Sequence, residues 1–287
     1  MRYSYERDPF QQPNQLKDST MTSLQRCPCI ATLSGLCFAV ASGAYAQVST
    51  INSAIINPRV YNDVPGATLT TVTTVSPYPS VPSLISFTEQ NVSGSGFANR
   101  DQWHFATNAG AGSYLFQNNN YFSISMNVAL TGDPASSLRK EAGFVFNNPL
   151  NDGGQFILDT DAHEIVAFGG FLPFYAFPST FVSGETVTMG ITYANIGGVN
   201  SIMYSEQTVL GPPGLSSPWL PLTNLELGVI NNTTIGGYFQ IQQDPHDPSN
   251  SGSAVFSKIN ISSVPEPSTF AFLGLGVLSL LLRRRRI

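Results

Sequence analysis

Between residues 47 and 264 the sequence is dominated by a strict alternation of hydrophobic and polar positions. In YFSISMNVAL (residues 121–130) five apolar side chains fall on one face, and in TVTMGITYA (residues 186–194) four do so. Alternation with a period of two predicts β-strands that are buried on one face. No window of this region shows the sustained stripe of an amphipathic helix, so we predict an all-β domain.

Further short β-rich runs follow one another along this region, separated by turn sequences such as TGDP, NDGG, VSGE and NIGG. The runs are TLTTVTTV, EAGFVFN, GQFILDT, EIVAFGG, GGYFQIQ and SAVFSKINIS. Many short strands with regular turns predict two antiparallel sheets packed face to face. We expect TLTTVTTV to be an edge strand, because a proline-rich segment follows it, and GPPGLSSPWLPLTN to be a long surface loop.

The first 46 residues have the features of a leader. Arg26 precedes a mostly apolar stretch from Ile30 to Val40, and Ala44-Tyr45-Ala46 has the small-x-small pattern of a cleavage site. This order predicts a secretory signal peptide that is cleaved after Ala46. The sequence leaves open whether translation starts at Met1 or at Met21.

The cysteine content and the net charge of the remaining chain differ from those of the whole sequence once this leader is set aside. All three cysteines lie within it, which excludes a disulfide framework in the mature protein. Residues 47–264 contain five basic and fourteen acidic residues, a net charge of −9. No basic patch remains to neutralise phosphate groups, so we do not expect nucleic-acid binding.

The densest polar cluster is LDTDAHEIVAFGG, where Asp159, Asp161, His163 and Glu164 lie within six residues. If the two aspartates alternate on a strand, both point to one face. Such carboxylates could bind calcium or contact a polysaccharide, or act as acid and nucleophile in glycoside hydrolysis. Asp and His are also ordinary turn residues between apolar strands, and this interpretation is favoured.

Other motifs add little chemistry. Some glycosidases with jelly-roll folds carry Glu-x-Asp-x-x-Glu on one strand, but here Asp159 replaces the first glutamate and the run is interrupted, which weakens the hydrolase hypothesis. The histidines lack metal-ligand spacing, and no nucleophile elbow is present. We therefore predict no catalytic residue, no bound metal and no cofactor other than a calcium ion that Asp159 and Asp161 could hold. Trp103 is expected in the core, whereas Trp219 could stack against a sugar.

The tail VPEPSTFAFLGLGVLSLLLRRRRI contains thirteen uncharged residues from Phe270 to Leu282. As a helix this stretch is roughly 20 Å long, shorter than the hydrocarbon core of about 30 Å. The arginines that follow are expected to stay on the cytoplasmic side. They are Arg283, Arg284, Arg285 and Arg286. A short terminal span of this kind suits a temporary hold in the inner membrane better than a permanent anchor.

Immediately before this stretch, Pro265-Glu266-Pro267 forms a stiff and extended segment. The order of Pro-Glu-Pro, short hydrophobic helix and arginine cluster resembles the PEP-CTERM sorting signal of Gram-negative bacteria. The resemblance implies recognition of Pro265, Glu266 and Pro267 by an exosortase, a membrane protease-transpeptidase. It also implies retention by the arginines, and delivery of the cleaved protein to the cell surface or to the exopolysaccharide matrix.

The phrases LRKEAGFVFNN, DTDAHEIVAFGG and GGYFQI resemble the β-sandwich found with such tails, and SAVFSKINIS resembles the last strand of concanavalin-like or laminin-G-like jelly rolls. We therefore expect a leader (residues 1–46), a jelly-roll domain (47–263) and a sorting signal (264–287). The leading hypothesis is a non-enzymatic surface protein that works among exopolysaccharides. The alternatives are a lectin-like module and, less favoured, a glycoside hydrolase.

Overall fold

The strands of the domain follow the predicted alternation. A computed structural model describes residues 50–74, 81–107, 110–132, 138–148, 151–170, 172–209, 213–222 and 230–264. The chain divides into two compact units, Met1–Val40 and Ala41–Ile287, and all described residues belong to the second. The predicted leader, the Pro-Glu-Pro segment and the arginine cluster lie outside the described residues.

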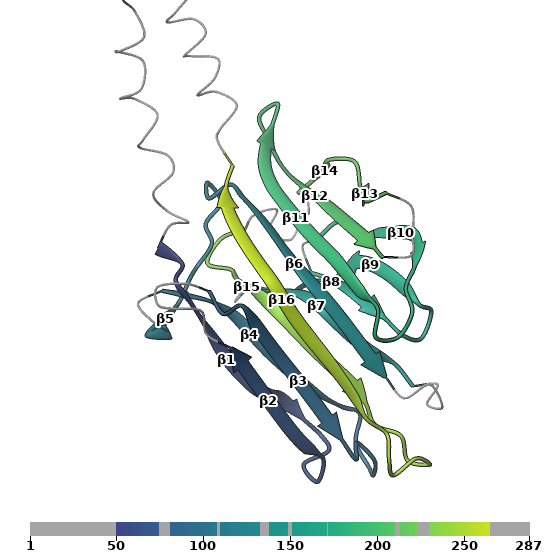
Figure 1. The fold of residues 1–287 in the computed structure, drawn as a ribbon. Coiled ribbons are helices and arrows are strands. Elements are labelled where there is room, and N and C mark those ends of the chain that lie inside the picture. The colour runs from purple at the N-terminus through teal and green to yellow at the C-terminus, as the bar shows by residue number, and fades with distance from the viewer. Residues whose placement is uncertain are drawn as a thin grey trace, which may run out of the picture. The chain divides into compact units, whose positions relative to one another are not determined.

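Two antiparallel sheets make up the described part of the chain (Figure 1). Sheet A has the order β1-β4-β15-β7-β8-β9-β10, with β5 paired to β4. Its strands are β1 (Ser53–Asn62), β4 (Ala98–Thr107), β5 (Gly112–Ser113), β7 (Lys140–Asn148), β8 (Asn151–Asp159), β9 (Glu164–Phe168), β10 (Tyr175–Thr180) and β15 (Thr234–Gln242).

Sheet B has the order β13-β12-β11-β6-β16-β3-β2, with β14 paired to β12. Its strands are β2 (Thr68–Thr74), β3 (Leu84–Gln90), β6 (Phe122–Gly132), β11 (Thr186–Ile196), β12 (Val199–Thr208), β13 (Leu215–Ser216), β14 (Leu220–Pro221) and β16 (Gly252–Ser263). The TLTTVTTV run is the edge strand β2, as predicted. The segment expected to be a loop contains the short strands β13 and β14.

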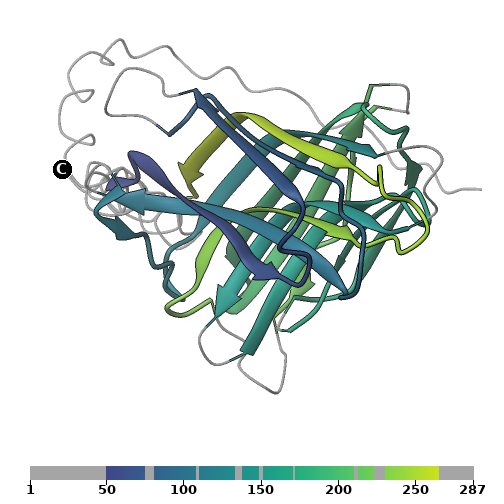
Figure 2. The same ribbon diagram turned by 90° about the horizontal axis from the view of Figure 1, so that it is seen from below.

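The chain crosses repeatedly from one sheet to the other, so several neighbours in a sheet are distant in sequence. In sheet A, β15 lies between β4 and β7, and in sheet B, β16 lies between β6 and β3 (Figure 2). This antiparallel sandwich confirms the prediction of an all-β jelly-roll domain. Among the described residues no helix is long and apolar enough to cross a membrane.

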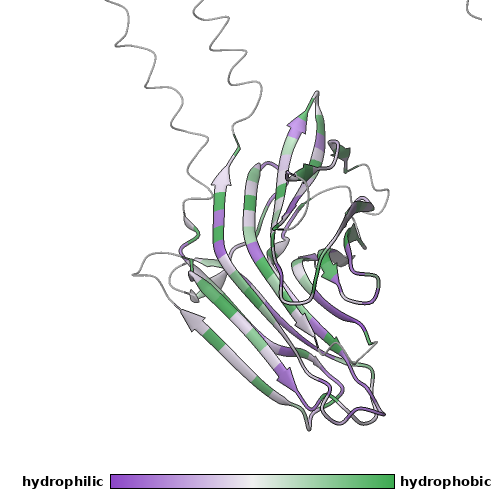
Figure 3. Cartoon of the chain, turned by 45° about the vertical axis from the view of Figure 1, so that its right-hand side comes forward, coloured by the Kyte–Doolittle hydropathy of each residue, from purple (hydrophilic) through white to green (hydrophobic). Residues whose placement is uncertain are grey.

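The core fills the space between the two sheets with aromatic and aliphatic side chains. Trp103 is buried, as predicted, and packs edge-on against Phe105 and Phe256 with ring centroids 5.3 and 5.9 Å apart. The second contact joins β4 of sheet A to β16 of sheet B. Gly237 on β15 leaves room for the indole, because a Cβ there would lie 2.3 Å from Trp103 Nε1. Hydrophobic and polar colours alternate along the strands in Figure 3, which is the pattern seen in the sequence.

Candidate functional site

The predicted site around Asp159 is a turn between two neighbouring strands of sheet A. Asp159 is the last residue of β8 and Glu164 the first of β9, and the two are paired in register. Asp161 and His163 lie in the exposed turn between them, where His163 has a left-handed φ of 52°. Asp161 thus lies outside the strand. The two aspartates therefore do not share one strand face, which differs from the arrangement that would place both on β8.

Structural contacts engage both oxygens of Asp159. Its Oδ1 accepts a hydrogen bond from Asp161 N at 2.9 Å, and its Oδ2 lies 2.9 Å from Arg139 Nη2. Arg139 also forms an ion pair with Glu141 on the neighbouring strand β7. Burial raises the pKa of both Asp159 and Glu141, while the Arg139 charge acts in the opposite direction. These contacts tie the β8–β9 turn to the start of β7.

Trp219 and the remaining histidines lie apart from this turn in the fold. Trp219 is in the segment between β13 and β14 and is 36% exposed. His246 is almost fully exposed, with Nδ1 3.8 Å from Asp244 Oδ1. Within the described ranges no group of three or more His, Cys, Asp or Glu residues could hold a metal ion. The calcium and sugar contacts suggested for these residues stay predictions.

Sequence reasoning missed a different surface, the face of sheet A that points away from sheet B. In RDQWHF the core residues Trp103 and Phe105 alternate with Arg100, Gln102 and His104, which therefore point outward. Outward residues of β7, β8, β9 and β15 form a separate small apolar cluster on this face. Its members are Val145, Ile157, Val166 and Tyr238, with Phe168 packed against them.

The strands in the middle of sheet A are buried on both faces. β15 is buried at seven successive positions, Ile235 to Ile241, whereas β6 in sheet B alternates regularly between buried and half-buried positions. The outward face of sheet A is thus crowded with side chains that largely cover one another. The signal that could have located this face is the polar half of the alternation in RDQWHF and GGYFQIQ.

A row of polar residues crosses this outward face from strand to strand. The paired positions on β1, β4, β15, β7, β8 and β9 are Tyr61, Arg100, Gln240, Glu141, Asp159 and Glu164. We call these six residues the polar row. Arg100 donates from Nε and Nη2 to Gln240 Oε1 at 2.9 and 2.7 Å, and Gln240 Nε2 donates to Glu141 Oε2 at 3.3 Å. The Asp159 of the sequence prediction belongs to this row.

Gln102 and His104, which follow Arg100 on the outward side of β4, are each hydrogen-bonded to residues of other strands. Gln102 Oε1 accepts a hydrogen bond from Asn147 Nδ2 at 3.1 Å, a contact that bridges β15. His104 Nδ1 lies 3.0 Å from Asn57 Nδ2, and His104 Nε2 lies 2.8 Å from Ser113 Oγ. Burial lowers the pKa of His104, so its imidazole is neutral and can donate to Ser113 while it accepts from Asn57.

Tyr238 lies beneath the guanidinium of Arg100, with Cζ 5.3 Å from the ring centroid. The ring is fully buried, and its hydroxyl has no hydrogen-bond partner among the residues that the structure describes. A buried polar group without a partner costs about 1–3 kcal/mol. The outward face of sheet A thus carries amide, imidazole, guanidinium and phenol groups. Burying polar groups costs free energy, so folding alone does not explain why they are there. Such groups can hydrogen-bond a ligand that carries many hydroxyls.

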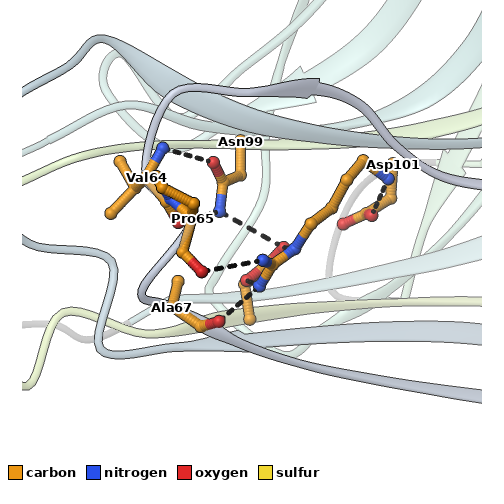
Figure 4. A network of polar contacts seen from close by, with 7 residues as sticks. Val64, Pro65, Ala67, Asn99 and Asp101 are labelled. Atoms are coloured by element: carbon orange, nitrogen blue, oxygen red, sulfur yellow. Dashed lines mark hydrogen bonds and ion pairs between the residues drawn. The ribbon is translucent and has the colours of Figure 1, made fainter.

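A second polar cluster faces the interior and joins the two sheets (Figure 4). The Arg59 guanidinium binds both oxygens of Glu89 on β3, at 3.1 and 3.0 Å, and donates to Ala67 O at 2.5 Å. Its backbone N donates to Asp101 Oδ1 at 2.8 Å. Asn99 exchanges two hydrogen bonds with the backbone of Val64. This cluster joins β1 to β4 of sheet A and to β3 of sheet B.

Comparison with known proteins adds one finding that concerns the end of the chain. The PEP-CTERM protein-sorting motif matches residues 263–286. The chain carries a PEP-CTERM sorting signal. The motif marks a protein for export and for processing by an exosortase, with an extracellular or cell-surface destination in a Gram-negative bacterium. The sequence-based recognition of this signal is confirmed.

No curated protein matches this chain by sequence. Solved structures with a similar arrangement of strands include the alginate lyase A1-II′ of polysaccharide lyase family 7, with 9% identity, a TM-score of 0.39 and coverage of 63% of this chain and 79% of that chain. The lectin UEA-II in complex with galactose has 8% identity, a TM-score of 0.38 and coverage of 74% and 98%. Arcelin-5, a lectin-like defence protein of Phaseolus vulgaris, has 12% identity and a TM-score of 0.38, and the match covers 74% of this chain and 97% of that chain. Similarity at this level assigns no activity.

Proposed function

We propose that this protein is a non-enzymatic exopolysaccharide-binding protein of the cell surface or extracellular matrix. In this proposal the leader (residues 1–46) is removed on export, the sandwich (47–263) is the binding domain, and the tail (264–287) holds the protein in the inner membrane until an exosortase acts. The sorting signal supports the destination, and polysaccharide is the polymer that the protein meets there.

One observation carries the binding part of the proposal, namely the buried polar groups on the outward face of sheet A. Sheet B shows what a face built for stability and solubility looks like, with small hydroxyl and amide groups that pair with their neighbours. Ser123 and Thr192 lie 3.1 Å apart there, and Thr188 donates to Asn127 at 2.9 Å. Sheet A instead carries large hydrogen-bonding side chains, among them the half-buried guanidinium of Arg100, which favours recognition of a polyhydroxylated ligand.

The test is a pull-down of the protein, recovered from the producing bacterium, with that organism's own exopolysaccharide. We expect the wild type to bind, with or without a chelator, because the outward face needs no metal. Gln102→Ala removes the bridge to Asn147 and should weaken binding at least tenfold. Thr188→Ala on the outer face of sheet B is the matched control and should bind like the wild type.

Three results would contradict the proposal in different ways. Absence of binding by the wild type removes the function itself. Equal binding by Gln102→Ala, with a circular dichroism spectrum like that of the wild type, removes sheet A as the binding face. The release of new sugar ends from the polysaccharide makes the protein an enzyme, and in that case Asp159→Asn and Asp161→Asn variants test the carboxylates first considered.

A further inference from the structure

We propose that the polysaccharide bound by this face is acidic, and that Arg100 and Tyr61 form a subsite for a carboxylate-bearing sugar. This inference rests on the proposed function and names the class of its ligand. It follows from the distribution of charge along the polar row and from the exposed aromatic ring of Tyr61 at the β1 end of that row.

The two arginines near the polar row have different partners. Arg139 is neutralised by two carboxylates, those of Glu141 and Asp159. Arg100 has no carboxylate within ion-pair distance among the described residues, and its hydrogen bonds go to the neutral amide of Gln240. No hydrogen bond involves its Nη1 atom within the described part of the chain. Of the two arginines, Arg100 is therefore the one that has no carboxylate within ion-pair distance among the described residues.

Arg100 is also only half-exposed, so its charge is partly removed from water. Burial lowers its pKa, while the more distant Glu141 and Tyr61 raise it. A partly buried cation gains most from an anion that approaches closely, because the surrounding dielectric is low. The ring of Tyr238 below and the amide of Gln240 beside it hold the guanidinium in one orientation. A preorganised guanidinium fork matches the geometry of a carboxylate.

An aromatic side chain is exposed next to Arg100. Tyr61 stands directly opposite Arg100 in the pairing of β1 and β4 and is 43% exposed. Exposed aromatic rings offer an apolar platform for the face of a sugar ring. An aromatic platform beside an unpaired guanidinium suits a sugar with one apolar face and one carboxylate.

The charge of the whole domain opposes a polyanion at long range, since residues 47–264 carry a net charge of −9. Attraction must therefore be local, at Arg100. Local ion pairing at a partly exposed site is weakened by salt, with a Debye length of about 8 Å at physiological ionic strength. Binding of the acidic polymer should accordingly fall as salt is added.

The experiment compares the binding of three probes to the mature protein recovered from the producing bacterium. Polygalacturonate carries one carboxylate per sugar, its methyl ester has the same backbone with that charge removed, and dextran is neutral. We expect polygalacturonate to bind at least tenfold more tightly than its methyl ester. Arg100→Gln keeps hydrogen-bonding capacity but loses the charge, and should reduce this preference to below twofold. Arg100→Lys keeps the charge without the fork and should retain part of it.

The results separate this inference from the function on which it rests. If the organism's own exopolysaccharide binds but polygalacturonate and its methyl ester bind equally, the acidic subsite is wrong and the binding function stands. If no polysaccharide binds, the proposed function itself fails. A Tyr61→Ala variant guards against misfolding of the Arg100 variants, because Tyr61 is exposed. Unchanged affinity for polygalacturonate in Tyr61→Ala removes the aromatic platform, and a preference that survives in Arg100→Gln removes the role of the guanidinium.

Discussion

Arg59 shows how much one residue can contribute to the join between the two sheets. It has a left-handed φ of 50°, which is uncommon for a residue with a side chain, and it lies where the pairing of β1 and β4 shifts register. This conformation directs its guanidinium towards Glu89 on β3 while its backbone N reaches Asp101 on β4. One arginine thus contacts two fully buried carboxylates, and within the described ranges Asp101 Oδ2 has no hydrogen-bond partner.

This excess of buried carboxylate makes stability depend on pH at the scale of one residue. Burial raises the pKa of Asp101 to about 7; the hydrogen bond from Arg59 lowers it and the nearby Glu89 raises it further. The folded protein therefore holds this proton more tightly than the unfolded chain, in which an aspartate has a pKa near 3.9. The resulting stabilisation is complete below the unfolded pKa and is lost as the pH rises through about 7.

We expect the urea midpoint of unfolding to be higher at pH 5.5 than at pH 8, because Asp101 is protonated in the folded state at the lower pH. Burial shifts the pKa of Glu89, Glu141 and Asp159 in the same direction. Asp101→Asn imitates the protonated form and should make the midpoint depend less steeply on pH. A variant with the full slope of the wild type would show that the proton resides elsewhere.

At the scale of elements, β15 is the strand on which the arrangement of sheet A depends. It pairs with β4 on one side and β7 on the other, so it brings Gln240 next to Arg100, 140 residues away in sequence. Its two adjacent glycines have separate packing reasons. A Cβ at Gly236 would lie 1.8 Å from Trp103 O, and one at Gly237 would collide with the Trp103 indole.

Gly237→Ala should therefore destabilise the protein by about 1–3 kcal/mol, the usual cost of inserting a methyl group into a packed core. Trp103 would have to move away from Phe256, against which it now packs. The matched control is Gly66→Ala, since Gly66 is exposed and has no atom within 4 Å of an added Cβ. Its effect should stay within about 0.5 kcal/mol. Urea titrations of both variants measure the difference, and equal midpoints would contradict this account of β15.

At the scale of the whole molecule, the sorting signal separates the question of destination from that of activity. The matched motif spans residues 263–286 and so follows directly on β16. Pro265 and Pro267 bias the chain between the domain and the hydrophobic stretch towards an extended backbone. An extended segment is accessible to a membrane protease in a way that a paired strand is not.

Replacement of Pro265, Glu266 and Pro267 by alanine should prevent release of the tail. We expect the variant to keep the mass of the uncleaved chain and to remain in the membrane fraction, as judged by mass spectrometry and cell fractionation. Replacement of Ser249 in the loop before β16 by alanine is a control outside the motif and should leave processing unchanged. The appearance of the alanine variant outside the cell at the mature mass would show that Pro-Glu-Pro is not the recognition element.

Strands could be predicted well from the sequence, and the site could not. The apolar residues alternate from Phe122 to Leu130 in β6 and from Val187 to Tyr193 in β11, so strand type and the buried face follow from local pattern alone. Asp159 attracted attention because four polar residues lie close together in sequence. Arg100, Gln240 and Tyr238 form their cluster only because β15 pairs with β4, and no local pattern encodes that pairing.

The sequence by itself determined the β-strands, the buried face of alternating strands such as β6, and the sorting signal, because each depends on residues that are neighbours in the chain. Tertiary structure alone decided the order of strands in the sheets, the Arg59 cluster between them and the polar row on sheet A. These features join residues from distant strands, and their energies come from burial and from register, which only the assembled sandwich provides. The unpaired charge of Arg100 is one of them, since it reflects the absence of a carboxylate on the neighbouring described strands.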